Sequence, residues 1–355
     1  MNSSQNNQNK ILDLLNQGLA LHAQGQLTSA HDCYHKALRI DPLHFDALHL
    51  IGIVNAQTGR LDLAIQQLSK AIAVSPNEPA AHANLANALR DAGRIDDAIH
   101  ACHKAIALDP NYAKSHANLG LLLLQSNKSS AALPHLQRAI ELNPEDHETW
   151  SNLGIAHLKV GRNQAAIESL GQALRIAPDD AVAHANLGAA LLECSQTTEA
   201  LSHIEQALKV QPNFVDAHVH RGHALHKMER LQESMASFQS ALSLHPNNVD
   251  ALCGLGNVHM TMLAFGQAAS CFEQAHAHEP QNSGLLLNLA NACVEINRVG
   301  EAIELLSRYI ADQPSNPRGH YNLAVAYLKD NQVGQAIVSF DETLRLDPHH
   351  HDALF

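Results

Sequence analysis

Asparagine recurs along this chain at one fixed spacing. Seven asparagines are separated by 34 residues or by a multiple of 34, namely Asn16, Asn84, Asn118, Asn152, Asn186, Asn288 and Asn322. Asparagine is a poor helix former, so its recurrence inside helical segments indicates that these side chains face something polar. A carboxamide both donates and accepts hydrogen bonds, so it can pair with a peptide N–H and C=O together. The column predicts a surface that binds peptide backbone.

Histidine is the second abundant residue type with chemical potential, with 26 copies. Five histidines share another column with the only tryptophan, Trp150, which predicts a half-buried aromatic slot: His82, His116, His184, His218 and His320. The cluster His220, His223 and His226 is a weak candidate for a metal site. The five histidines of the tryptophan column cannot share one zinc ion, because zinc requires nitrogen ligands at about 2.0–2.1 Å and equivalent positions lie a whole repeat apart. We therefore expect these imidazoles to serve packing, with no metal and no cofactor.

Proline marks the period that positions both columns. Ten of the thirteen prolines follow one another at steps of 34 residues, from Pro42 to Pro348. Counting back from each proline defines ten units: 11–44, 45–78, 79–112, 113–146, 147–180, 181–214, 215–248, 249–282, 283–316 and 317–350. Position 20 of the unit is alanine except at Ser234, and position 8 is always glycine or alanine. Apolar spacing and turn residues predict helix A at positions 1–14 and helix B at positions 18–31.

These columns resemble the tetratricopeptide repeat over residues 11–350. The resemblance implies an all-α solenoid, a right-handed superhelix of ten helix-turn-helix units, whose concave groove is lined by position 6. The strings at 81–86, 115–120 and 183–188 are similar to repeats in the receptor arm of O-linked N-acetylglucosamine transferases. In that arm, an asparagine ladder grips an extended peptide.

Two interpretations of the asparagine column stay open at the level of sequence. In one, the amides bind a peptide in the groove. In the other, they bond to neighbouring helices and stabilise the stack. His220 and Gly254 interrupt the column, so the run from Asn84 to Asn186 is the better candidate for peptide binding.

Composition narrows the classes of partner. The 355 residues carry a formal net charge of −12 and no run of lysine or arginine, which predicts no nucleic-acid partner. No apolar stretch approaches the roughly 20 residues that span a bilayer, so no membrane partner is expected. Six cysteines lie at unpaired spacings, which favours free thiols in a cytoplasmic protein. No catalytic motif is present, so the sequence predicts a module that binds proteins and not an enzyme.

The two ends suggest further expectations. Residues 1–10 are polar and predict a disordered lead-in, while residues 351–355 match the start of a truncated eleventh unit. Two explanations fit a last unit without a polar cap. The sequence is a fragment of a longer protein, or the uncapped end mediates self-association. An alternative function follows from the first: the array recruits substrates for a fused glycosyltransferase whose catalytic domain lies beyond residue 355.

Overall fold

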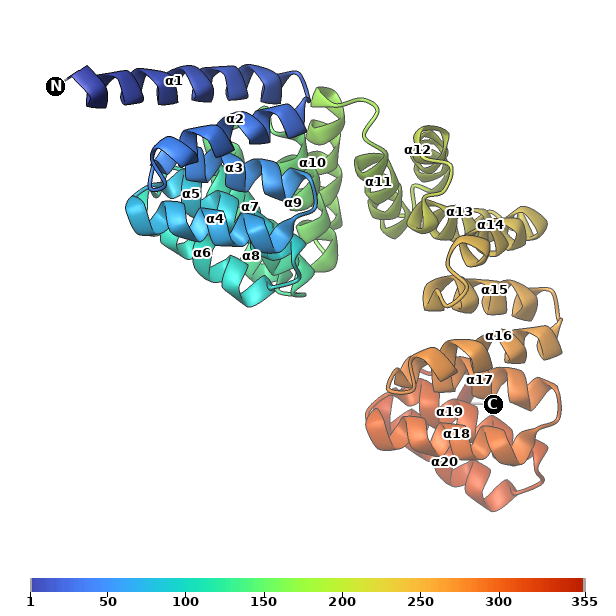
Figure 1. Cartoon of the computed structure of the whole chain (residues 1–355). Coiled ribbons are helices and arrows are strands. Elements are labelled where there is room, and N and C mark those ends of the chain that lie inside the picture. Colours follow the sequence, from blue (N-terminus) through green and yellow to red (C-terminus); the bar gives the residue numbers. More distant parts are fainter. Residues whose placement is uncertain (1, 354–355) are drawn as a thin grey trace. The chain divides into compact units, whose positions relative to one another are not determined.

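Helices form all of the regular secondary structure in the computed structural model, which describes residues 2–353 (Figure 1). The chain divides into two compact bodies, Met1–Pro178 and Asp179–Phe355. The first body contains α1 (Asn2–Ala23), α2 (Leu27–Ile40), α3 (Phe45–Gln57), α4 (Leu61–Val74), α5 (Pro79–Asp91), α6 (Ile95–Leu108), α7 (Ala113–Gln125), α8 (Ser129–Leu142), α9 (His147–Lys159) and α10 (Asn163–Ile176). The second contains α11 (Ala181–Glu193), α12 (Thr197–Val210), α13 (Val215–Lys227), α14 (Leu231–Leu244), α15 (Val249–Thr261), α16 (Phe265–His278), α17 (Ser283–Glu295), α18 (Val299–Asp312), α19 (Pro317–Lys329), α20 (Val333–Leu346) and η1 (His351–Ala353).

Odd-numbered helices are helix A of their units, and even-numbered helices are helix B. Each helix A packs against the helix B that follows it, and within a body each helix B packs against the next helix A. The predicted all-α solenoid of paired helices is confirmed in these terms, whereas the right-handed superhelix stays a prediction. No helix among residues 2–353 combines the length and the apolar character that crossing a membrane requires.

A left-handed residue at position 15 closes each helix A. After α5, Gly93 has φ of 74° and its N–H donates to Arg90 O at 2.9 Å, while Arg94 N–H donates to Leu89 O at 2.8 Å. This pair of bonds satisfies carbonyls that the helix end leaves open. Six units place a residue other than glycine there, including Leu263 with φ of 58°. The turn is therefore set by the repeat geometry and not by glycine alone.

The small-residue columns let the two helices of a unit approach closely. Ala98 and its equivalent Ala132 are fully buried. At position 8, a Cβ added to Gly222 would lie 2.6 Å from the ring of Phe238, the position 24 residue of the same unit. A glycine there accepts a large neighbour at position 24, so the two columns complement each other.

The ring residues at position 4 form hydrogen bonds with the turn between successive repeats. The Nε2 atoms of His82, His116, His218 and His320 lie 2.9–3.0 Å from the carbonyl oxygen of the closing proline six residues earlier. Trp150 donates its indole N–H to Pro144 O at 2.9 Å in the same way. The slot therefore supplies one N–H donor for the carbonyl of the preceding turn. This geometry gives a structural reason for part of the high histidine content.

Both chain ends differ from the sequence prediction or lie outside the described residues. Residues 2–10 belong to α1, so the expected disordered lead-in is wrong for that range. Helix extension adds one hydrogen bond per residue once a nucleus exists, and the buried Ile11 and Leu15 anchor that nucleus on α2. Residues 351–353 form η1, which packs on α20. Met1, Leu354 and Phe355 lie outside the described range, so the truncated eleventh unit stays a prediction.

Candidate functional site

The asparagine column lies on the odd-numbered helices, one residue to a helix. Asn16 is exposed on α1, and the six other amides are half-buried on α5, α7, α9, α11, α17 and α19. The six half-buried amides are therefore only partly accessible to solvent. The run proposed from Asn84 to Asn186 is divided between the bodies, because Asn84, Asn118 and Asn152 lie in the first and Asn186 lies in the second.

Asn84 is the centre of a hydrogen-bonded row across three successive A helices. Its Nδ2 atom lies 2.8 Å from Nε2 of His49 on α3, and its Oδ1 accepts a hydrogen bond from Lys114 Nζ on α7 at 3.1 Å. Burial lowers the pKa of His49, and burial also lowers the pKa of Lys114. The neutral imidazole accepts the amide N–H, so both functions of this carboxamide are used within the protein.

Other members of the column also bond within the protein, but less completely. Asn118 Nδ2 lies 3.5 Å from Ala83 O, at the outer limit of a hydrogen bond. Asn322 Nδ2 donates to Asn291 Oδ1 at 2.8 Å, and Asn186 Nδ2 donates to the Val182 carbonyl of its own helix at 2.8 Å. Among the described residues, each leaves the carboxamide oxygen and one N–H unused, because an amide group has two donors and an acceptor with two lone pairs.

Three amides keep their full capacity among the described residues. Asn16, Asn152 and Asn288 make no side-chain hydrogen bond to another residue in the range 2–353. In the first body, Leu121 and Ile155 lie three residues after Asn118 and Asn152 on the same helix face, and both are half-buried. This part of the surface therefore combines amide groups with aliphatic ones. We call the surface formed by positions 6 and 9 of α5, α7 and α9 the amide face.

The lysines at position 13 strengthen contacts between A helices in the second body. Lys227 Nζ donates to Leu192 O at 2.9 Å, and Lys329 Nζ donates to Val294 O at 3.4 Å. Lys329 also forms an ion pair with Glu295 at 3.3 Å. These ammonium groups stabilise the carboxyl-terminal carbonyls of the preceding helix A, as expected for cations at a helix end.

Packing explains why the column breaks at α15. A Cβ added to Gly254 would collide with the ring of Phe238, which fills the space between α13, α14 and α15. The interruption therefore follows from the large residue at position 24 of the preceding unit. The sequence shows both residues, but their contact spans 16 positions and two units.

The histidine cluster of α13 does not form a metal centre. Among the described residues, no three His, Cys, Asp or Glu side chains lie close enough together to hold a metal ion. His226 Nε2 lies 3.0 Å from Thr261 Oγ1, and the ring of His223 meets Phe238 edge-on with centroids 5.0 Å apart. Burial, followed by the neighbouring His220, His226 and Lys227, lowers the pKa of His223 to about 4. The lowered pKa keeps the His223 imidazole neutral.

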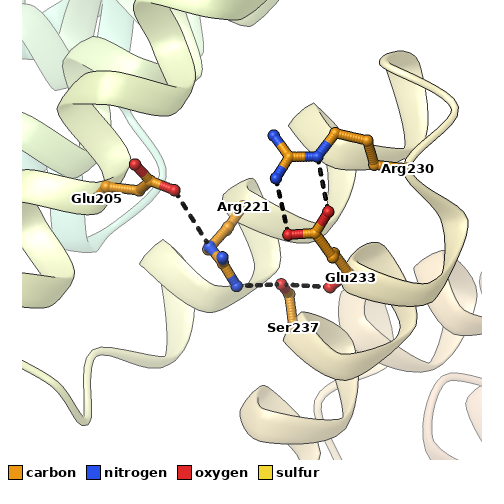
Figure 2. Close-up of polar contacts among 5 residues, drawn as sticks. All are labelled: Glu205, Arg221, Arg230, Glu233 and Ser237. Atoms are coloured by element: carbon orange, nitrogen blue, oxygen red, sulfur yellow. Dashed lines mark hydrogen bonds and ion pairs between the residues drawn. The ribbon is translucent and has the colours of Figure 1, made fainter.

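Arg221 is a polar residue that the repeat pattern marks but sequence reasoning missed. It occupies position 7 of its unit, where Leu119, Leu153 and Leu187 stand in earlier units. Figure 2 shows its guanidinium between Glu205, a residue of α12, and Ser237, a residue of α14. Its Nη1 donates to Ser237 Oγ at 3.1 Å, and its Nε lies 3.8 Å from Glu205 Oε1. Polar contacts of Arg221 thus replace the apolar contacts that leucine makes at this position in other units. The sequence signal for this residue was a charged side chain in a column where leucine predominates.

Comparisons with known proteins agree with this architecture. Four models described as tetratricopeptide repeat match residues 157–225 and 264–326, 15–79 and 117–181, 79–112, and 215–248. Together these matches span well over half of the chain.

A solved structure shares the fold. The chain is similar to one in the crystal structure of the APC/C hetero-tetramer Cut9-Hcn1, at 17% identity and a TM-score of 0.62 over 96% of this chain and 74% of that one. A crystal structure of MamA matches at 25% identity and a TM-score of 0.41, over 46% of this chain and 95% of that one. With repeat-model matches in both bodies and twenty paired helices behind them, the chain belongs to the tetratricopeptide repeat family.

Proposed function

We propose that this repeat protein binds an extended segment of a partner protein along the amide face of the first body. The observation that carries the proposal is the placement of Asn84, Asn118 and Asn152. They stand on three successive A helices, half-buried, with hydrogen-bonding capacity left on Asn118 and Asn152. The same proposal assigns Asn16 as a further contact in the first body, and Asn186, Asn288 and Asn322 as separate peptide contacts within the second body.

The spacing of the amides suits a stretched peptide. Packed helices lie about 8–10 Å apart, and an extended chain advances about 3.3 Å per residue. One amide therefore meets the peptide backbone at roughly every third residue. Because side-chain alternation follows the backbone, peptide side chains that point inward meet Leu121 and Ile155, which favours aliphatic residues at those places.

Asn84 has a different role from its two neighbours in this mechanism. Its carboxamide is held by His49 and Lys114, so peptide binding there exchanges one of these contacts for one with the peptide. The Lys114 ammonium that is released then faces the peptide and favours a carbonyl or a carboxylate. The row from His49 to Lys114 positions the first contact, and Asn118 and Asn152 supply amides that still have unused hydrogen-bonding groups.

A selection from a library of unstructured random peptides provides the probe. The affinity of the selected peptides is then compared between the parent and the variant Asn84→Ala, Asn118→Ala, Asn152→Ala. Three lost hydrogen bonds at about 0.5–1.5 kcal/mol each weaken binding by about tenfold or more. The matched control replaces Asn77, Asn213 and Asn247, three exposed asparagines in turns, and should bind as the parent does.

Two results would contradict the proposal. One is an unchanged affinity in the amide-face variant. The other is a variant that unfolds far below the parent, because the asparagines would then act as internal contacts of the stack. The recruitment of substrates for a fused glycosyltransferase is an alternative that uses the same surface, and the reading frame beyond Phe355 distinguishes it.

A further inference from the structure

Three polar groups on successive A helices of the first body form a row in which each group fixes the state of the next. Asn84 Oδ1 lies 3.1 Å from Lys114 Nζ, and Asn84 Nδ2 lies 2.8 Å from His49 Nε2. An ammonium group has donors only, so the carboxamide oxygen faces Lys114. The amide NH2 group then faces His49, and Nε2 of that imidazole has to accept. His49 is therefore neutral in this arrangement, with its proton on Nδ1.

This combination of residues occurs once in the chain. His49 is the only histidine at position 5 of a unit, and Lys114 is the only lysine at position 2. Asn118, the next amide of the column, has Ala83 at the place of the histidine and reaches its backbone carbonyl. A carbonyl does not titrate, whereas an imidazole changes its charge near neutral pH. The acceptor of Asn84 can therefore be removed by a proton, and the acceptor of Asn118 cannot.

The surroundings of His49 keep its ring neutral at pH 6.5, the ordinary midpoint of histidine. Burial lowers the pKa of His49 below that value, and the charge of Lys114 on α7 acts in the same direction. Asp46 on α3, Glu78 before α5 and a backbone contact with Ala80 act in the opposite direction. Within residues 2–353, no group of α1, α2 or α4, the other helices packed against α3, is among the charges that act on the ring. The ring therefore takes up its proton below pH 6.5.

Protonation of His49 reverses the direction of the Asn84 carboxamide. An imidazolium has N–H donors on both nitrogens and no acceptor, so Nε2 then donates and Asn84 Oδ1 is the group that receives the bond. Rotation by half a turn about the last side-chain bond exchanges the oxygen and the NH2 group, which brings the NH2 group towards Lys114. Two donors do not bond to each other, so the exposed Lys114 ammonium moves away from the amide. Both N–H groups of Asn84 are then unused.

This reversal changes what a peptide has to displace. When His49 is neutral, both functions of the Asn84 carboxamide are used within the protein, so a peptide gains a contact there only by breaking one. When His49 is protonated, the amide N–H groups are available to a peptide carbonyl without such an exchange. A net hydrogen bond of ordinary strength corresponds to an affinity that is about two- to tenfold higher.

We propose that His49 is a proton-controlled switch of the amide face: its protonation reverses the Asn84 carboxamide, releases Lys114 and strengthens peptide binding in acid. The inference rests on the proposed peptide-binding function and assigns a regulation to the same surface. Coupling between two binding events is reciprocal. A bound peptide therefore also favours the protonated form of His49, and the ring titrates at a higher pH in the complex than in the free protein.

An NMR titration of the whole chain without peptide, from about pH 7.5 to about pH 5, tests the switch itself. At the upper end, Nε2 of His49 should carry no proton, and the side-chain amide protons of Asn84 should lie close to the ring. On acidification these protons should leave the ring with the midpoint of the imidazole, while Asn118 keeps its contact with Ala83. A proton on Nε2 at the upper end, or an Asn84 amide that does not follow the ring, would overturn the proposal.

Calorimetry with a selected peptide measures the effect on binding. The peptide has blocked ends and contains no histidine, aspartate or glutamate, so it does not titrate in this range. The parent should bind it about two- to tenfold more tightly at the lower pH. The variant His49→Gln should bind with the same affinity at both pH values, because a carboxamide keeps its donors and acceptor. The matched control His100→Gln removes an exposed imidazole from α6 and should respond to pH as the parent does.

Circular dichroism at both pH values establishes that parent and variants keep the same helical content. A parent whose affinity does not rise in acid would overturn the regulation, and so would a His49→Gln variant that keeps the response of the parent. Both results leave peptide binding itself intact. Absence of peptide binding at either pH would refute the amide-face function and this regulation with it, so the two failures are distinguishable.

Discussion

Acid should destabilise the second body through His223, and the size of the effect follows from its surroundings. The side chain lies against Phe238, and its pKa is lowered from 6.5 to about 4, first by burial and then by His220, His226 and Lys227. The folded state therefore resists protonation, whereas the unfolded chain accepts a proton below pH 6.5. The contribution of His223 to the free energy of unfolding is fully present above pH 6.5. It decreases as the pH drops from 6.5 to 4, and no further decrease occurs below pH 4.

The magnitude comes from the two pKa values. A tenfold change in a protonation equilibrium is worth about 1.4 kcal/mol, so the full effect of this imidazole is about 3 kcal/mol. Between about pH 7 and about pH 4.5, linkage gives a loss of about 2 kcal/mol from His223 alone. The variant His223→Leu removes this contribution, so its free energy of unfolding should fall by about 2 kcal/mol less than that of the parent over the same interval.

Urea denaturation of parent and variant at both pH values measures that difference, and an NMR titration of the His223 ring measures the pKa directly. The control His278→Leu removes an exposed imidazole from α16 and should keep the acid sensitivity of the parent. A ring that titrates near 6.5, or equal losses in parent and His223→Leu, would refute the reasoning.

Two further substitutions test how the repeat pattern stabilises the fold. Asn55 is 2% exposed at position 11, and its Oδ1 has no hydrogen-bond partner within residues 2–353. Leu89 and Leu123 fill that position in the next two units. Asn55→Leu should raise the free energy of unfolding by about 1–3 kcal/mol in urea denaturation, and a loss of stability would show that the amide has a partner. Leu263 holds the left-handed φ of 58° in the turn after α15, so Leu263→Gly should add about 1 kcal/mol. A melting temperature that falls in Leu263→Gly would contradict this.

The fold was predictable because each unit repeats the same residue types at the positions that define its two helices and its turns. Alanine at position 20, glycine or alanine at position 8 and proline at position 32 specify a helix pair within 34 residues. From α2 to α20, each helix begins and ends within one residue of the predicted position, and Ala98 at position 20 is fully buried. The error at residues 2–10 arose because polar composition suggests disorder, whereas a helix anchored by Ile11 extends through weak helix formers.

The roles of individual amides could not be predicted from the sequence. The bond between Asn84 and His49 joins positions 35 residues apart, and Asn118 reaches Ala83 across the same separation. Both partners lie in the preceding unit, where the side chain at that place varies from repeat to repeat. The sequence identified which residues share a face, but the contacts along that face depend on how neighbouring A helices meet.

The most direct test of the central claim is the NMR signal of the side-chain amides of Asn84, Asn118 and Asn152 during titration with a selected peptide. The account predicts that these carboxamide resonances shift with the fraction bound and show contacts to the backbone protons of the peptide. Resonances that stay in place at saturation, while the peptide contacts other helices, would contradict it.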